Sequence, residues 1–466
     1  MNRPRSDVAY DVRVWAVSKY RGKRGSTYTV RWRVDGDRHQ RTFSTAKLAD
    51  SFRSELLTAA RNGFPFDSSS GLPAMLVKER DERTWYEHAV AFVDMKWPHA
   101  AARHRQGLAE ALATVTPALT TTTDDAPPAD LVRRALFRWS FNATARQGDP
   151  PDDLMEALAW IEEHSLPLSE AARAENVRAA LHALSLKIDG TAAASSTVMR
   201  KRSAFYSALQ YAVELELLQA NPLDRISWKR PVAAEAVDRR VVVNPTQARA
   251  LLAAIRTISP AVEGFFACLY FAGLRPSEAV NLRERDCYLP VSGWGELTLV
   301  GSHQAAGRAW TDSGTAGEER GLKHRSPQET RHVPAHPELV ATLRRHLDEF
   351  LIGPDGRLFV TRTGKRGVPL PPPYSNPLSM GTAYRVWHRA RVEALSPPQV
   401  SSPLARRPYD LRHACLSTWL NAGVPATQVA EWAGHSVTVL LKVYAKCIDG
   451  QDEAAKRRIE QALRTA

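Results

Sequence analysis

Residues 11–43 alternate apolar and polar side chains in short runs, a pattern typical of half-buried strands in an antiparallel sheet. In the longest run, from Tyr28 to Val34, the even positions are apolar and the odd positions are polar. A shorter run from Val12 to Ala16 precedes it. Asp35-Gly36 marks a tight hairpin turn, and Gln40 to Phe43 follows as another strand. The pattern predicts a three-stranded sheet.

Helical spacing of apolar residues begins directly after this sheet. Ser44 or Thr45 suits the cap of a first helix that runs through Phe52 and Leu56. From about Thr84 to Leu218 apolar residues again recur at helical intervals, without a chemical motif between residues 150 and 168. We therefore expect one helix after the sheet and then an all-helical region.

Two linker-like stretches divide the chain into three predicted domains. Residues 67–73 are rich in Ser, Gly and Pro, and residues 229–236 begin with Lys-Arg-Pro. The fold class is therefore multidomain. We expect a small β-sheet plus helix over residues 1–66, an all-α domain over 74–232, and an α+β, mainly helical domain over 238–466. Residues 453–466 have one apolar helical face, which either caps this domain or docks on a neighbouring subunit.

Composition agrees with this picture. The 466 residues are 44% hydrophobic and 24% charged, as in globular proteins, and their number suits about three domains. The apolar stretch from Phe265 to Leu274 is about half as long as a membrane-spanning helix requires, so we expect a buried core helix and no membrane partner. The N-terminus lacks the apolar segment of a secretory signal, which favours a cytoplasmic protein. Four scattered cysteines without C-x-x-C pairing argue against disulfides and zinc: Cys268, Cys287, Cys415 and Cys447.

The net charge of +13 favours a polyanionic partner. It is concentrated at the start, where residues 1–66 hold 14 Lys and Arg against 6 Asp and Glu. Four of these basic residues lie on the predicted sheet, and they either form a basic surface for DNA or solvate an exposed face. They are Arg31, Arg33, Arg38 and Arg41.

Three segments of the C-terminal domain carry candidate chemistry. In AGLRPSE at 272–278, Arg275 lies between two predicted helices and can offer a planar fork to a phosphate. In YDLRH at 409–413, Asp410 is a natural N-cap and Arg412 falls in the first turn of a helix, where an anion is favoured. His435 lies at the end of a short helix, and Tyr444 follows nine positions later on a new helical segment. Each residue, taken alone, is also compatible with a structural role.

Taken together, these segments resemble the tyrosine recombinase family, and specifically phage integrases. The order of GLRPSE, DLRH and GH followed after eight residues by Tyr444 is found in that family. The resemblance covers about residues 241–466. The middle region resembles the family's core-binding domain mainly in its last helix, and residues 1–66 resemble the arm-type DNA-binding domain.

The resemblance implies a role for each residue. Arg275 and Arg412 match the arginines that grip the non-bridging oxygens of the scissile phosphate. His435 matches a residue that hydrogen-bonds the phosphate, and Tyr444 matches the nucleophile. Lys323 matches the β-hairpin lysine that protonates the leaving 5′ oxygen.

A hairpin around Lys323 is plausible from the residues themselves. Ser326 to Glu329 makes a turn, and Thr330 to Pro334 forms the returning strand. Lys365, in a later loop, is the competing lysine.

One position departs from the family pattern. Many members carry His or Lys three residues before the second arginine, where this chain has Tyr409. A phenol is a poor base near pH 7, so the proton acceptor for Tyr444 stays open. His413, about 100° around the helix from Arg412, is expected to be a supporting residue, as is Glu278.

The resemblance implies a site-specific DNA recombinase that forms a 3′-phosphotyrosyl intermediate on double-stranded attachment sites and integrates or excises a mobile element or prophage. A tyrosyl link conserves the phosphodiester energy, so neither ATP, metal nor another cofactor is expected. The resemblance also implies a tetramer in the synaptic complex and is compatible with accessory DNA-bending or directionality proteins. The alternative is a catalytically impaired accessory or regulatory DNA-binding protein of the same fold; a relaxing topoisomerase fits less well.

Overall fold

The computed structural model describes residues 8–22, 25–43, 45–68, 71–73, 83–121, 123–231, 236–323, 326, 329–444, 456–457, 459–460 and 463. Most of the predicted helix over 453–466 therefore lies outside the described residues. Contacts between residues divide the chain into two compact units. They comprise Met1–Ala100 with Gly107–Arg230, and Ala101–Gln106 with Pro231–Ala466.

The first unit begins with a sheet built around strand β4, Gly25–Val34. β2 (Val12–Val14) and β3 (Ser18–Gly22) pair along one edge of β4, and β5 (Asp37–Phe43) pairs along the other. The prediction of three strands missed β3, because its one large apolar residue, Tyr20, is exposed and leaves no alternation to detect. β1 (Val8–Ala9) pairs with β6 (Phe66–Asp67) in a separate ribbon.

The predicted turn and helix around this sheet are confirmed. Asp35 and Gly36 have φ of 46° and 91°, the left-handed backbone that a tight hairpin requires. Thr45 caps helix α1 (Ala46–Arg61), and its hydroxyl accepts the backbone N–H of Leu48 at 3.3 Å. α1 packs against the sheet face that carries Val30, Trp32 and Val34.

The opposite face of the sheet is basic. Arg33 lies directly across from Arg38 on β5 and Arg13 on β2, and shares its face with Arg31. Arg41 differs, because it pairs with Val30 and so lies on the helix side, with its guanidinium 5.2 Å from the centre of the Phe52 ring. The exposed face therefore holds three of the four predicted arginines, and Arg13 as well.

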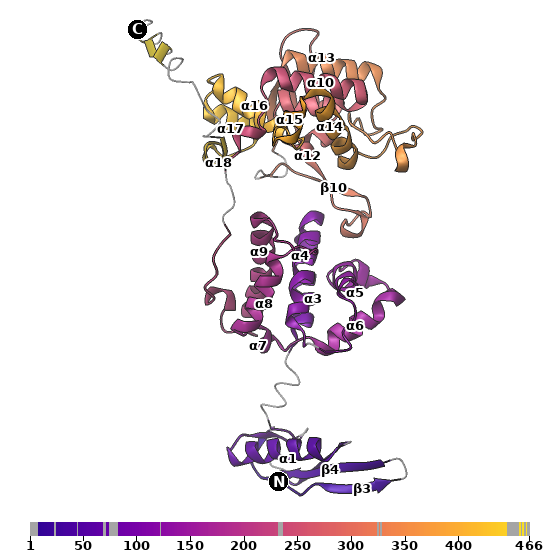
Figure 1. Cartoon of the computed structure of the whole chain (residues 1–466), viewed down its shortest axis with the longest axis vertical. Coiled ribbons are helices and arrows are strands. Elements are labelled where there is room, and N and C mark those ends of the chain that lie inside the picture. Colours follow the sequence, from indigo (N-terminus) through magenta and orange to yellow (C-terminus); the bar gives the residue numbers. More distant parts are fainter. Residues whose placement is uncertain are drawn as a thin grey trace, which may run out of the picture. The chain divides into compact units, whose positions relative to one another are not determined.

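The rest of the first unit is helical, as expected from its apolar spacing (Figure 1). Trp85 opens its first helix, is fully buried, and donates its indole N–H to Thr116 at 3.0 Å. The main helices are α3 (Trp85–Lys96), α4 (Ala102–Val115, of which the residues from Gly107 on belong to this unit), α5 (Ala129–Ala135), α6 (Asp152–His164), α7 (Leu168–Ala171), α8 (Ala174–Ser185) and α9 (Ser195–Glu214).

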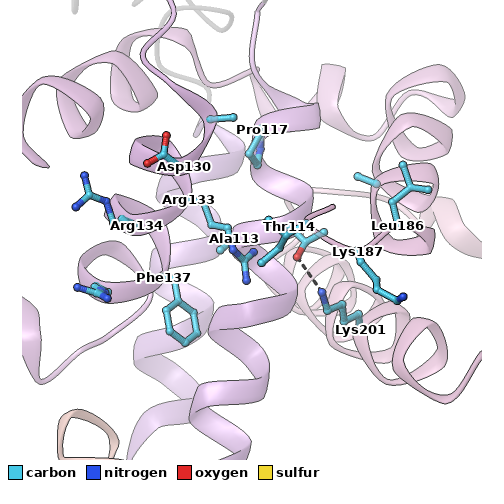
Figure 2. A pocket seen from close by; sticks show the side chains of 14 residues that line it. Ala113, Thr114, Pro117, Asp130, Arg133, Arg134, Phe137, Leu186, Lys187 and Lys201 are labelled. Atoms are coloured by element: carbon cyan, nitrogen blue, oxygen red, sulfur yellow. Dashed lines mark hydrogen bonds between the residues drawn. The ribbon is translucent and has the colours of Figure 1, made fainter. Parts of the chain in front are cut away.

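A cavity of about 690 Å³ opens among these helices (Figure 2). Lys201 reaches it from α9 and donates to the Thr114 hydroxyl at 3.2 Å. One acidic residue, Asp130, faces five basic ones around the wall, so positive charge dominates. The basic residues are Arg133, Arg134, Arg138, Lys187 and Lys201.

The second unit is mainly helical with short strands. Its core surrounds α11 (Glu263–Phe271), in which every residue after Glu263 is buried. The predicted core helix is thus confirmed, and no helix in the described ranges is long and apolar enough to cross a membrane. The other helices are α10 (Pro245–Ile258), α12 (Pro276–Asn281), α13 (Pro337–Glu349), α14 (Met380–Ala394), α15 (Pro397–Ser401), α16 (Asp410–Asn421), α17 (Ala426–Ala433) and α18 (Val437–Tyr444).

The strands of this unit correct the expected lysine hairpin. β8 (Gly295–Leu299) lies between β7 (Cys287–Tyr288) and β11 (Arg331–Ala335), whereas β9 (Ser302–Ala305) pairs with β10 (Gly317–Arg320). The strand after the predicted turn therefore pairs with β8, not with the segment that carries Lys323. The sequence pattern locates a strand but does not specify its partner.

Candidate active site

Four helix ends meet at the candidate site: the α11–α12 junction, the start of α16, the end of α17 and the end of α18. All belong to the second unit. They bring Arg275, Arg412, His435 and Tyr444 together through side-chain contacts and through hydrogen bonds to the carbonyls of Ala433 and Gly434. The structure thus brings together four of the five residues matched to the family's catalytic groups.

Arg275 occupies the N-cap position of α12, with extended backbone before Pro276. Its guanidinium donates to Glu278 at 2.6 Å and to the carbonyl of Gly434, at the end of α17, also at 2.6 Å. The side chain is 15% exposed, so Glu278 and Gly434 fix its guanidinium while part of it still reaches the surface. A fork fixed in this way suits an anionic ligand.

Glu278 joins Arg275 to a second arginine that the sequence analysis missed. Arg331, on β11, makes two hydrogen bonds to the Glu278 carboxylate, at 3.0 and 2.7 Å, and both side chains are 2% exposed. Burial alone would raise the pKa of Glu278, but Arg331, Arg275 and Arg412 lower it to about 2. Glu278 is therefore ionised, and it lies between two arginines.

Arg412, in the first turn of α16 as predicted, is fully buried. It donates to the carbonyl of Gly273 and, at 2.7 Å, to that of Ala433. The two predicted arginines thus bind consecutive carbonyls at the end of α17, where helix dipoles favour cations. These hydrogen bonds fix the end of α17 against both arginines.

His435 follows α17 and accepts a hydrogen bond from Arg412 at Nε2, 3.1 Å away. An arginine can only donate, so the proton of this imidazole is on Nδ1. Burial first, and then the charges of Arg412 and Arg275, lower the pKa of His435 to about 3. His435 is a neutral donor whose buried Nδ1 has no hydrogen-bond partner among the described residues.

Tyr444 ends the described part of α18 and is 1% exposed. Its hydroxyl lies 2.9 Å from Nδ1 of His413, and its ring is stacked with the His435 ring at a centroid distance of 6.4 Å. His413 had been expected only to support the site. The structure instead brings it into direct contact with the candidate nucleophile.

Tyr409 precedes α16 and its ring packs edge-on against His413, with centroids 5.0 Å apart. The predicted capping role of Asp410 is wrong. Asp410 is the first helical residue, and its buried carboxylate accepts the backbone N–H of Arg407 at 2.8 Å instead. Burial raises the pKa of Asp410 despite this contact.

Lys323 lies in the connection between β10 and β11 and is exposed. Among the described residues, no hydrogen bond or ion pair joins Lys323 to the four helix ends, so the structure does not bring it into the site with the other matched residues. Lys365 begins a short helical turn, Lys365–Gly367, and its side chain lies outside the described part of the chain.

Comparison with known proteins gives one curated relative at low identity. The chain is 28% identical over 182 residues to the tyrosine recombinase XerC of Methylobacterium sp. (strain 4-46). The match covers 39% of this chain and 43% of the relative, so the chain spans less than half of that protein's length. No protein-family model matches. The resemblance to tyrosine recombinases inferred from the motifs is confirmed at this level.

Solved structures with a similar arrangement include recombinases bound to DNA. The Tn1549 transposon integrase with circular intermediate DNA gives a TM-score of 0.44 at 16% identity, covering 68% of this chain and 98% of the integrase. A lambda integrase tetramer bound to a Holliday junction gives 0.42 at 13% identity, covering 96% of each chain. At this level of similarity they indicate neither substrate nor reaction for this chain.

The Glu278 contacts predict a specific pH dependence. Because the folded pKa of about 2 lies below the ordinary 4.5, ionised Glu278 stabilises the fold above about pH 4.5, and this stabilisation is lost as the pH falls towards 2. Glu278→Gln should cost roughly 3–5 kcal/mol at pH 7, because Arg331 loses its buried partner. Denaturant unfolding should show the gap between wild type and variant shrinking below pH 4.5.

The matched control is Glu338→Gln, which removes an exposed pair with Arg249. It should cost under about 1 kcal/mol. Equal costs for the two variants at pH 7, or a gap that does not change with pH, would contradict the role given to Glu278.

Gly434 offers a second test of the site's packing. Its φ is +64°, and an added Cβ would lie 3.1 Å from Arg275 Nη1 and overlap Arg331 Nη1. Gly434→Ala should therefore lose about 1–2 kcal/mol from backbone strain and roughly 1–3 kcal/mol more from overpacking. Gly314→Ala has φ of +66° and open space around its Cβ, so it should show only the backbone loss in the same unfolding measurement.

Proposed function

We propose that this chain is a site-specific DNA recombinase of the integrase type, which cleaves and rejoins DNA through a 3′-phosphotyrosyl intermediate. The observation that carries the proposal is the Tyr444 hydroxyl, held by His413 beside the contacts that join His435, Arg412 and Arg275. A phenol next to fixed cations and hydrogen-bond donors suits attack on a phosphodiester. Its substrates would be double-stranded attachment sites of a mobile element or prophage.

The charge around Tyr444 suits the transition state of this reaction. Attack on a phosphodiester adds negative charge, and preorganised donors that meet it provide the largest part of such catalysis. Arg275 and Arg412 would hold the non-bridging oxygens. The Nδ1–H of His435, which lacks a partner among the described residues, would donate to one of them. A buried donor of this kind gains free energy when a ligand accepts its hydrogen bond.

Lys323 is proposed as the acid that protonates the leaving 5′ oxygen. Its support is its place in the family pattern, in an exposed connection between two strands. Arg331 and Glu278 are proposed as positioning residues, because they act through Arg275.

The proposed partner is DNA, in agreement with the net charge of +13 and the basic face of the N-terminal sheet. That face would bind an arm-type sequence distinct from the crossover site. The middle helices would be a core-type DNA-binding domain, and a tetramer would form at synapsis, with or without accessory proteins. The reaction would need no metal or ATP, and a cytoplasmic location stays a prediction.

The alternative is a catalytically impaired DNA-binding protein of the same fold. Tyr409, in place of the usual His or Lys, is the observation that favours it. Trapping of covalent adducts by the wild-type chain distinguishes the two.

Tyr444→Phe tests the nucleophile. The variant should bind DNA like the wild type but form no covalent adduct on a nicked suicide substrate, because the ring remains and only the attacking oxygen is lost. Incubation with DNA from either side of the gene, with EDTA and without ATP, followed by mapping of the adduct, gives the cleavage site and tests cofactor independence. Full trapping by Tyr444→Phe would exclude the assignment.

Loss of Arg31 and Arg38 tests the N-terminal face. The double alanine variant should bind arm-type DNA more weakly, with the slope of log affinity against log salt reduced by about two, because each phosphate contact releases about one counterion. Arg61→Ala, at the end of α1, is the matched loss of one exposed charge away from the sheet and should change the slope little. An unchanged slope in the double variant would leave this face without a DNA role.

A further inference from the structure

The replacement of the usual His or Lys by Tyr409 leaves the proton of Tyr444 without an acceptor in the family pattern. From the side chains around the Tyr444 hydroxyl, we infer that His413 accepts this proton during strand cleavage and returns it during rejoining. The inference rests on the proposed function. It assigns to His413 a catalytic role that neither the family pattern nor the order of the motifs supplies.

His413 is in direct contact with the hydroxyl of Tyr444. His413 Nδ1 lies 2.9 Å from Tyr444 Oη, within the range of a strong hydrogen bond, and the ring centroids are 5.6 Å apart. Arg412 and His413 are neighbours on α16, so their side chains point in different directions around the helix. Arg412 is directed to the carbonyls of Gly273 and Ala433, whereas His413 is directed to Tyr444.

Two other groups near Tyr444 are less suited to the task. His435 uses Nε2 to accept from Arg412, and its Nδ1 carries the proton, so it has no free basic nitrogen for the phenol. Tyr409 presents another phenol, which is itself a weak acid rather than a base. Its ring, edge-on to His413, instead restricts the imidazole to an orientation that faces Tyr444.

The environment also keeps His413 in its proton-accepting form. Burial first, and then the charges of Arg407 and Arg412, lower the pKa of His413 to about 4, so the imidazole is neutral at pH 7. With the proton on Nε2, the lone pair of Nδ1 is directed at the phenol.

In strand cleavage, one phosphate ester bond replaces another. Tyr444 Oη forms a bond to phosphorus while the bond from phosphorus to the 5′ oxygen breaks. The phenolic proton passes to His413 Nδ1, and the 5′ oxygen leaves as a hydroxyl after it takes a proton from a general acid, proposed as Lys323. Rejoining reverses each transfer, so no oxidant, reductant or metal is consumed.

The first experiment measures the rate of covalent adduct formation by the full chain on a nicked suicide substrate at pH 7. His413→Gln keeps a hydrogen-bonding side chain of similar reach but cannot take a proton, and should slow trapping about 100-fold, the lower range of general-base catalysis. His388→Gln, at an exposed histidine of α14 that makes none of the site's contacts, is the control and should stay within about 3-fold of wild type. Tyr409→Phe keeps the ring that packs on His413 and removes only its hydroxyl, so its loss should be much smaller than that of His413→Gln. The reverse order of losses would place proton acceptance on Tyr409 and overturn the inference.

The second experiment separates proton acceptance from positioning. Replacing Tyr444 with a ring-fluorinated tyrosine, whose phenol ionises at lower pH, removes most of the need for a base. In this background His413→Gln should slow covalent trapping by less than about 10-fold. A loss that stays about 100-fold would mean that His413 only orients Tyr444, and the inference would fail.

Wild-type trapping distinguishes this failure from failure of the proposed function. If the wild-type chain forms no adduct on its own attachment DNA, the recombinase assignment fails. If the wild type forms the adduct and His413→Gln forms it equally fast, only the inference about His413 fails. Thermal unfolding of each variant, expected within a few degrees of wild type, excludes loss of the fold as the cause.

Discussion

The buried carboxylate of Glu278, shared by Arg275 and Arg331, is the interaction on which the rest of the candidate site depends. It joins the first turn of α12 to strand β11 and keeps Arg275 facing the end of α17. Removing such a carboxylate leaves a buried arginine without a counter-charge, which costs far more than an exposed pair. The orientation of Arg275 is therefore set by a contact that does not involve Tyr444 itself.

The end of α17 connects this buried pair to Tyr444, the candidate nucleophile. Its last carbonyls accept hydrogen bonds from Arg275 and Arg412, and the left-handed backbone of Gly434 then directs the chain to His435. Only glycine combines this backbone with the close approach of Arg331. α18 follows directly, so the position of Tyr444 depends on the same helix end.

Local sequence signals were sufficient to predict the helix boundaries at the candidate site. Pro276 after Arg275, the DLRH segment and Gly434 before His435 each mark a helix boundary, and the structure has boundaries at all three. The helix after Thr45 and the Asp35-Gly36 turn were equally predictable. Strand β3 was not, because its residues are exposed and only backbone pairing to β4 defines it. Asp410 looked like a helix cap, but the helix begins one residue earlier and its carboxylate turns back to Arg407.

Pairing between distant segments was decided only by the tertiary structure. The sequence by itself determined which residues lie at helix ends, because capping and turn preferences act within a few residues. It did not determine that β11 pairs with β8 rather than with the Lys323 segment, that Arg331 meets Glu278, or that Arg41 lies on the helix side of its sheet. Nor did it determine that His413 contacts Tyr444, since these residues are 31 positions apart on two different helices. Such contacts depend on register and packing, which the periodicity of one segment does not encode.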